Sequence, residues 1–189
     1  LKCNEEFFYQ FQSLGNYSHQ EKYIESVKNF QSRLKDELKK NLSIRIHPSD
    51  KISRYKKSFK DIKIHDGNEN IMQFIQKLKL CILTYNATTY FHTLALNIPT
   101  IIFFDDVIIR KDAIKYFDYL REANILFDDH NKAADFINSI YPNLEKWWFS
   151  EKTQKNIRLF TKNYLDLNKT NQNRYDNLIK DILKNKKNA

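Results

Sequence analysis

The sequence predicts an α/β protein with a Rossmann-like parallel sheet of about five strands, covered by helices on both faces. Short apolar runs alternate along the chain with longer segments whose apolar residues recur every three or four positions. The 189 residues include only two glycines and three prolines, so regular elements joined by short loops should dominate. Aromatic residues make up 14% of the chain, which argues against disorder and supplies material for a core.

The chain begins with a predicted strand and a long helix. Residues 7–11 (FFYQF) favour a strand and precede Gly15 and Asn16, a turn signal. Ser18 is a suitable N-cap for a helix over residues 19–40, whose apolar residues share one face. Those residues are Tyr23, Ile24, Val27, Phe30, Leu34 and Leu38.

Two further strands follow. The strand over residues 42–46 should end at His47, because Pro48 has no backbone N–H and disfavours a helical residue before it. A brief strand over residues 61–64 ends in the turn sequence HDGN at residues 65–68.

Helices and strands then alternate, which is typical of crossover connections in a parallel sheet. The expected order is helix 69–79, strand 80–84, helix 89–97, strand 100–104, helix 111–123, the strand-like residues 125–127 and helix 131–140. In helix 111–123 we expect Ile114, Phe117 and Leu120 to be buried.

The character of the chain changes after Pro142, so we divide it into a Rossmann-like domain, residues 1–142, and a helical extension, residues 143–189. Trp147 and Trp148 are interpreted as core or interdomain residues rather than a stacking platform. Two helices are predicted after them, near residues 150–166 and 171–186.

The net charge of +9 suits nucleic acid, an anionic membrane surface or anionic small molecules. The basic residues, however, are spread over predicted helix faces at residues 28–40, 51–63 and 180–187. We therefore interpret most of them as solvated helix surface, and no nucleic-acid-binding module is recognisable.

Cysteine and histidine usage predicts neither a disulfide framework nor a metal site. Cys3 and Cys81 lie far apart, which favours a reducing cytoplasm, and the five histidines show no zinc-binding spacing. No apolar run approaches the roughly 18 residues of a transmembrane helix, and no signal peptide is visible. The chain starts at Leu1 without an initiator Met, so we expect a piece of a longer protein.

Polar residues converge on the carboxyl edge of the predicted sheet, where parallel sheets bind their ligands. They are Arg45 and His47 at the second strand, His65 and Asp66 at the third, the loop 84–89 after the fourth, and Asp105 and Asp106 after the fifth. Each has an ordinary explanation, because a histidine at a strand end is often structural and Asp66 can cap the next helix. Gly-rich phosphate loops are excluded, since the glycines are Gly15 and Gly67.

The loop before helix 89–97 is the most informative segment. Asn86, Thr88 and Thr89 are short hydrogen-bonding residues where the backbone N–H groups of a helix lack partners and attract a phosphate. An ordinary N-cap would use the same residue types, so both interpretations remain open.

Three segments, RIHPSD, TYNATTYFHTLALNIPTIIFF and WWFSEKTQKNIRLFTKNY, resemble the C-terminal half of a family of bacterial surface-carbohydrate transferases. That family is similar to the GT-B glycosyltransferases, the CDP-glycerol glycerophosphotransferases and the CMP-sugar transferases. The likeness spans residues 7–164. It implies a CMP-, CDP- or UDP-linked donor as substrate, a glycan or lipid-linked acceptor, no cofactor and no metal. It also implies a cytoplasmic protein with peripheral contact to the inner face of the membrane.

Carried over by position, the resemblance implies that His47 and Pro48 hold the phosphate side of the donor. Thr88 and Thr89 would bind the donor phosphate through hydroxyl and backbone N–H groups. Arg45 would assist them or serve packing, since it shares the face of His47 on the strand.

The candidates for ribose or base contacts are His65, Asp66 and His92. The resemblance departs from its pattern at His92, where related families have an acidic residue that meets a ribose hydroxyl.

The first hypothesis is therefore the donor-binding half of a GT-B-type transferase that moves a sugar or polyol-phosphate unit to a cell-surface polysaccharide. The catalytic base is then expected in an N-terminal domain outside this chain, the fragment alone is expected to be inactive, and nucleic acid is not a partner. The alternatives are a non-catalytic basic module that binds nucleic acid or an anionic membrane surface, and a sugar-nucleotide enzyme resembling an epimerase.

Overall fold

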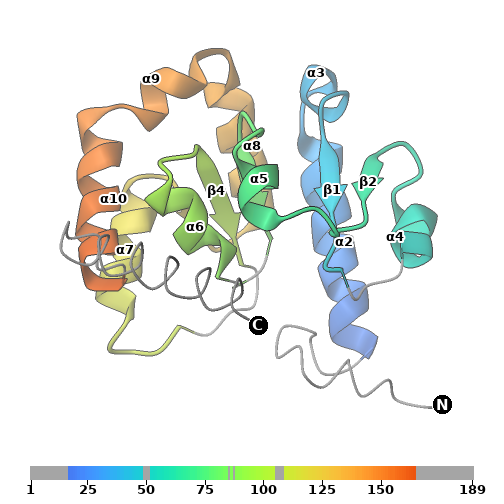
Figure 1. The fold of residues 1–189 in the computed structure, drawn as a ribbon, viewed down its shortest axis with the longest axis horizontal. Helices are drawn as coiled ribbons and strands as arrows, with labels where there is room; N and C mark the ends of the chain where they lie inside the picture. Colours follow the sequence, from blue (N-terminus) through green and yellow to red (C-terminus); the bar gives the residue numbers. More distant parts are fainter. Residues whose placement is uncertain (1–16, 49–51, 85, 87, 105–108, 165–189) are drawn as a thin grey trace, which may run out of the picture.

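The computed structural model describes residues 17–48, 52–84, 86, 88–104 and 109–164, and it confirms an α/β protein with parallel strands (Figure 1). The elements of the first half are α2 (Tyr17–Arg33), α3 (Asp36–Lys39), β1 (Ser43–Arg45), α4 (Ile52–Ser58), β2 (Lys63–His65), α5 (Ile71–Ile75) and β3 (Cys81–Leu83). Those of the second half are α6 (Thr89–Ala95), β4 (Thr100–Phe103), α7 (Ile114–Glu122), β5 (Leu126–Phe127), α8 (His130–Ile140), a 3₁₀ turn (Tyr141–Asn143), α9 (Leu144–Trp148) and α10 (Glu151–Tyr164).

The described strands form two parallel sheets, and the expected single sheet of about five strands is not shown among them. β1 pairs with β2, and β3, β4 and β5 pair in that order. Within the described residues, β1 and β3 therefore each have a hydrogen-bonded neighbour on one side only. The expected strand over residues 7–11 lies outside the described residues, as does the expected helix over residues 171–186.

The three-stranded sheet is buried because β4 has apolar side chains on both faces. Ile101 and Phe103 point into one cluster of buried residues, and Ile102 and Phe104 into another, as the alternation of a strand requires. All four are at most 5% exposed. A strand that is buried at every position, as β4 is, is typical of a parallel sheet covered on both faces.

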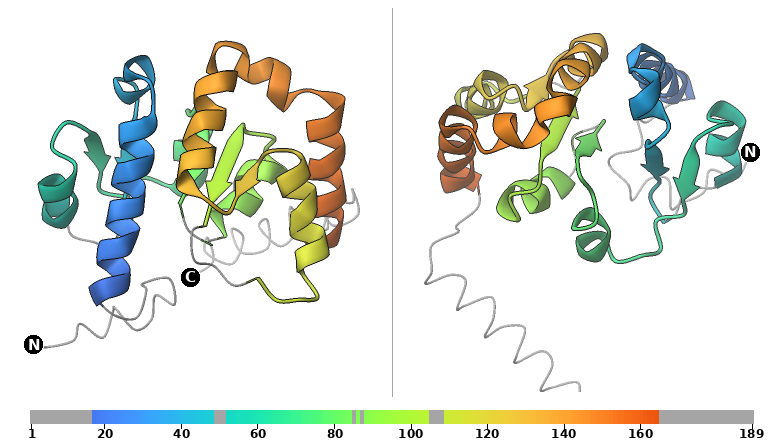
Figure 2. Two further views of the ribbon diagram at one scale, coloured as in Figure 1. Left: turned by 180° about the vertical axis from the view of Figure 1, so that it is seen from behind. Right: turned by 90° about the horizontal axis from the view of Figure 1, so that it is seen from above.

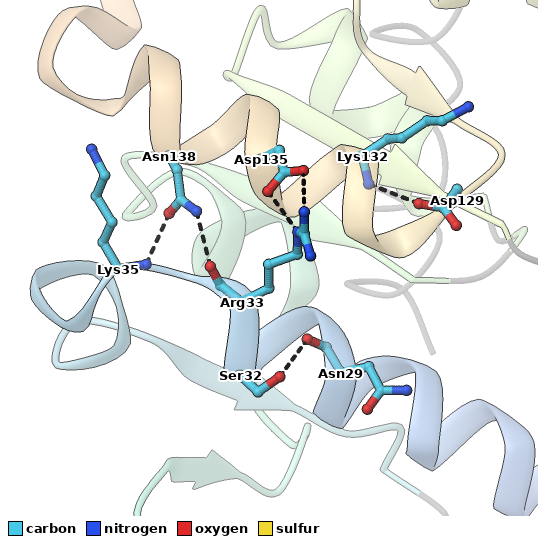
Figure 3. Close-up of polar contacts among 8 residues, drawn as sticks. All are labelled: Asn29, Ser32, Arg33, Lys35, Asp129, Lys132, Asp135 and Asn138. Atoms are coloured by element: carbon cyan, nitrogen blue, oxygen red, sulfur yellow. Dashed lines mark hydrogen bonds and ion pairs between the residues drawn. The ribbon is translucent and has the colours of Figure 1, made fainter.

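Helices α2 and α8 pack together over one face of this sheet (Figure 2). Phe30 of α2 stacks on Phe103 of β4, with ring centroids 4.8 Å apart. Arg33 binds Asp135 of α8 through two hydrogen bonds of 2.6 and 2.7 Å (Figure 3). The guanidinium of Arg33 lowers the pKa of the Asp135 carboxyl, chiefly by hydrogen bonding.

The single helix expected over residues 19–40 is wrong, because the helix breaks between α2 and α3. Lys35 has extended backbone angles, and Asn138 of α8 binds both sides of the break (Figure 3). Its amide donates to the carbonyl oxygen of Arg33 at 2.9 Å and accepts from the backbone N–H of Lys35 at 2.9 Å. Ser18 lies inside α2 and is therefore not its N-cap.

Helices α6, α7 and α10 cover the opposite face of the three-stranded sheet. Phe117 of α7 and Phe160 of α10 meet edge to face at 5.4 Å, and Leu120 is fully buried, as expected. Ile114, which was expected in the core, is 41% exposed because it lies in the first turn of α7.

The tryptophan pair serves the core, as the sequence predicts. Trp148 is 0% exposed, and its indole N–H donates to the carbonyl and side-chain oxygens of Asn97, both at 3.0 Å. The indole of Trp147 donates to the carbonyl oxygen of Ala123 at 3.0 Å. Helices α9 and α10 thus share one apolar cluster with β4 and β5, and the division at residue 142 stays a prediction.

Helix α5 is shorter than the expected 69–79, and Asn70 caps it by accepting from the backbone N–H groups of Met72 and Gln73. Among the residues described, none of the helices is long and apolar enough to cross a membrane.

Candidate functional site

A cavity of about 840 Å³ lies between the two sheets. Every residue of β1 and of β3 lines it, together with residues of α2, α4, α5 and α6. Of the residues selected from the sequence, it contains Arg45, His47, Pro48, Thr88, Thr89 and His92. The cavity therefore brings together the ends of two strands that belong to different sheets.

Arg45 ends β1 and holds the loop that follows β2. One terminal nitrogen of its guanidinium donates to the carbonyl oxygens of Gly67, at 2.5 Å, and Glu69, at 2.8 Å. The guanidinium also lies over the ring of Phe74, 5.4 Å from its centroid. Its Nε atom is buried and has no hydrogen-bond partner in the described part of the chain, although a buried donor is normally satisfied.

Gly67 places the His47-Pro48 backbone, which the sequence pattern did not reveal. Its φ of +82° is a conformation that residues with a Cβ adopt only at a cost. A Cβ at this position would lie 2.3 Å from the carbonyl oxygen of Ile46 and 2.9 Å from the nitrogen of Pro48. The HDGN turn signals the glycine, but only the folded chain shows what it touches.

His65 and Asp66, two of the ribose or base candidates, do not line the cavity. The ring of His65 packs edge-on against Phe74, with centroids 5.0 Å apart. The carboxylate of Asp66 accepts from the backbone N–H of Asn68 at 3.0 Å and from its side-chain amide at 2.8 Å. These bonds, the backbone one first, lower the pKa of Asp66. Asp66 thus bonds within its own turn, and the next helix is capped by Asn70 rather than by Asp66.

The loop after β3 and the start of α6 supply the polar residues of the other wall. Thr88 precedes α6, but its hydroxyl makes no capping hydrogen bond. The ordinary N-cap interpretation therefore does not account for Thr88. Thr89 is half-buried, and His92 one turn later has a buried Nδ1 atom without a hydrogen-bond partner among the described residues. Asn86 is exposed and does not line the cavity.

A hydrogen bond between Tyr23 and Thr84, 2.5 Å long, joins α2 to the end of β3 at the cavity. The sequence placed Tyr23 on the apolar face of a helix and gave no signal for this contact. Because Phe30 of α2 also packs on Phe103 of β4, the bond adds a second contact between α2 and the three-stranded sheet and fixes the end of β3 against this helix.

The cavity is basic. Arg45, Lys77 and Lys79 line it. Among its described lining residues the acidic side chain is Glu69, which is ion-paired with Lys77.

Burial raises the pKa of the Cys81 thiol, which also lines the cavity, to about 12, so this cysteine is no nucleophile at neutral pH. Among the residues that the structure describes, no group of three His, Cys, Asp or Glu side chains could hold a metal ion. Asp105 and Asp106 lie outside those residues.

A model of the family described as "LIC12162 family transferase" matches residues 1–180 of the chain. No curated protein and no solved structure matches the chain.

Proposed function

The chain belongs to the LIC12162 family of transferases, and we propose that it binds the nucleotide-activated donor of a glycosyltransferase-like reaction. The unit transferred is a sugar or a polyol phosphate, and the acceptor is a surface glycan or its lipid-linked precursor. The donor's phosphate lies in the cavity between the two sheets. Donor binding by a Rossmann-like half is the arrangement that the GT-B resemblance implies.

The convergence of unsatisfied and basic groups in one cavity supports this proposal. Among the residues that the structure describes, Arg45 Nε from β1 and His92 Nδ1 from α6 are buried without hydrogen-bond partners. Leaving a buried polar group unpaired costs roughly 1–3 kcal/mol, so such groups are rare unless a ligand or water completes them. Both line the cavity that also contains His47, Thr88 and Thr89.

These groups suit a phosphate ester chemically. The guanidinium of Arg45 and a ring N–H of His47 can donate hydrogen bonds to phosphate oxygens, and the hydroxyls of Thr88 and Thr89 add further ones. In the transfer, an acceptor hydroxyl gives up its proton to the base expected outside this chain and forms a bond to the donor carbon or phosphorus, while the bond from that atom to the nucleotide oxygen breaks. The nucleotide leaves with the electron pair, and the negative charge that develops on its phosphate is stabilised by these donors.

Helix α6 has seven residues, so its dipole contributes little beyond its first N–H groups. The side chains therefore carry most of the proposed phosphate recognition. In this proposal Nδ1 of His92 accepts from, or donates to, a ribose hydroxyl, where the resemblance implies a carboxylate in related families.

The test is calorimetric titration of the protein with CMP, CDP, UDP and GDP at moderate salt. One nucleotide should bind saturably. His47→Ala and the double variant Thr88→Ala/Thr89→Ala should each weaken binding by about 1–3 kcal/mol, the range for a charge-assisted hydrogen bond. Unchanged affinity in both variants would remove the site assignment.

His65→Ala is the matched control. It removes the same side chain from the end of the neighbouring strand, but His65 lies outside the cavity, so affinity should not change. Salt separates the proposal from simple charge attraction, because polyanion binding falls steeply as salt rises. A nucleotide affinity that follows salt as steeply as the affinity for a nucleic acid would favour the basic-module alternative.

A further inference from the structure

Two strand edges in this fold face the same cavity and lack a neighbour. In the described residues β1 pairs only with β2, and β3 pairs only with β4, yet every residue of both strands lines the cavity. The consequence shows in their burial. All residues of β4, which has two neighbours, are buried, whereas Ile44 of β1 and Ile82 of β3 remain half-buried. Unpaired apolar strand edges invite another strand.

β1 and β3 run in the same direction. Leu42 and Leu80 immediately precede them, and both pack against one cluster of buried residues, so the amino ends lie together. At the other end, Thr84 follows β3 and bonds to Tyr23 in the first half of α2. Since β1 returns antiparallel to α2 (Figure 1), its carboxyl end lies at that same end of α2. One parallel strand can therefore pair with both edges.

We propose that residues 7–11 of this chain insert between β1 and β3 as a parallel strand and join the two sheets into one. The sequence FFYQF has four aromatic residues in five and no Gly or Pro, which suits a strand that is buried on both faces. The resulting strand order is β2, β1, residues 7–11, β3, β4, β5, which is the order of doubly wound sheets. A cavity of this volume suits a ligand as well as a strand. The unpaired edges of β1 and β3 favour a strand.

The connection has the right length. Residues 12–16 join the inserted strand to the start of α2 at Tyr17, and loops of about 2–6 residues are usual between a strand and a helix. Helix α2 then leads back to β1, which completes a strand–helix–strand unit whose two strands are adjacent, the commonest connection in parallel sheets.

The inserted strand leaves the proposed donor site open. It occupies the apolar middle of the cavity, along Ile44 and Ile82, whereas His47, Thr88 and Thr89 follow the strands at the carboxyl edge. The inference does not depend on the proposed function, because it rests on strand edges and not on phosphate donors.

Hydrogen exchange measured by mass spectrometry on the whole chain tests it without any substitution. The amides of residues 7–11 should exchange within about tenfold of those of β4, because a central strand opens with the core. Exchange at the rate of an unfolded peptide would refute the inference. Protection that appears only at concentrations where the protein dimerises would also refute it, since a second copy would then supply the strand.

A proline substitution tests the position of the strand. Tyr9→Pro removes a ladder hydrogen bond and should increase exchange in β1 and β3 by at least about tenfold while β5 changes less. Lys2→Pro, outside the segment, is the control and should leave all three strands unchanged. If Tyr9→Pro leaves β1 and β3 as protected as in the original protein, the strand does not lie between them.

Discussion

Replacing Gly67 by alanine should destabilise the protein and weaken the proposed nucleotide site together. Gly67 has a φ of +82°, and the Cβ of an alanine would lie 2.3 Å from the carbonyl oxygen of Ile46. That distance is too short for any real contact, and the atom it meets is backbone, so the segment that leads to His47 and Pro48 must move.

The magnitude follows from two terms. An L-residue in the left-handed region costs roughly 1–2 kcal/mol, and forcing an extra methyl into a filled space costs about 1–3 kcal/mol. Shifting the segment also strains the ladder bond from the backbone N–H of Ile46 to the carbonyl of His65, now 3.1 Å. We therefore expect Gly67→Ala to lower the free energy of unfolding by about 2–5 kcal/mol.

Urea denaturation followed by tryptophan fluorescence measures the first effect, and nucleotide titration of the folded fraction measures the second. Affinity should fall by at least about tenfold, or 1.4 kcal/mol, because His47 moves with its backbone. Asn124→Gly is the matched control: Asn124 has a φ of 54°, so glycine relieves strain and stability should not fall by more than about 0.5 kcal/mol. A Gly67→Ala protein with unchanged stability and affinity would refute the contact between this turn and the His47 segment.

Three further predictions concern the core. Phe117→Ala should cost about 3–5 kcal/mol of unfolding free energy, whereas Ile114→Ala in the same helix, 41% exposed, should cost less than about 1 kcal/mol; equal costs in urea denaturation would contradict the assigned face of α7. Trp148→Phe should cost about 2–4 kcal/mol, from lost volume and the hydrogen bonds to Asn97, and Trp147→Phe, only half-buried, should cost less in the same assay. In a Cys3→Ser background, stability should fall as pH rises from 8.5 towards the folded-state pKa of about 12 for Cys81, because the unfolded chain loses this proton first; at pH 10 the loss should be about 2 kcal/mol, and Cys81→Ala should abolish it.

The strands were predictable because each contains a short apolar run near turn residues. All five described strands overlap predicted ones, although β2 begins later than expected and includes His65, which was assigned to the turn. The break between α2 and α3 was not, because Asn138, more than one hundred residues along the chain, makes the two hydrogen bonds that replace helical ones. Local periodicity in residues 19–40 cannot report a partner that distant.

The sequence predicts that the candidate residues gather at the carboxyl ends of the strands, but it does not predict which of them line the cavity. His47 and His65 look equivalent in the sequence, since each ends a parallel strand. They differ because β2 is paired only with β1 in the described part, away from the cavity, and His65 turns to Phe74 instead. The position of a strand in the sheet decides which strand ends lie close together. The sequence of an individual strand does not reveal that position.

The two proposals for the cavity make a joint prediction that separates them. His47→Ala alters only the polar edge, so it should weaken nucleotide binding and leave the exchange of residues 7–11 unchanged. Tyr9→Pro alters the apolar middle. It should increase the exchange of residues 7–11 and also weaken nucleotide binding, because the inserted strand fixes the distance between β1, which carries Arg45, and β3, which leads to Thr88. Nucleotide binding that survives Tyr9→Pro unchanged would mean that the spacing of β1 and β3 at the donor site does not depend on residues 7–11.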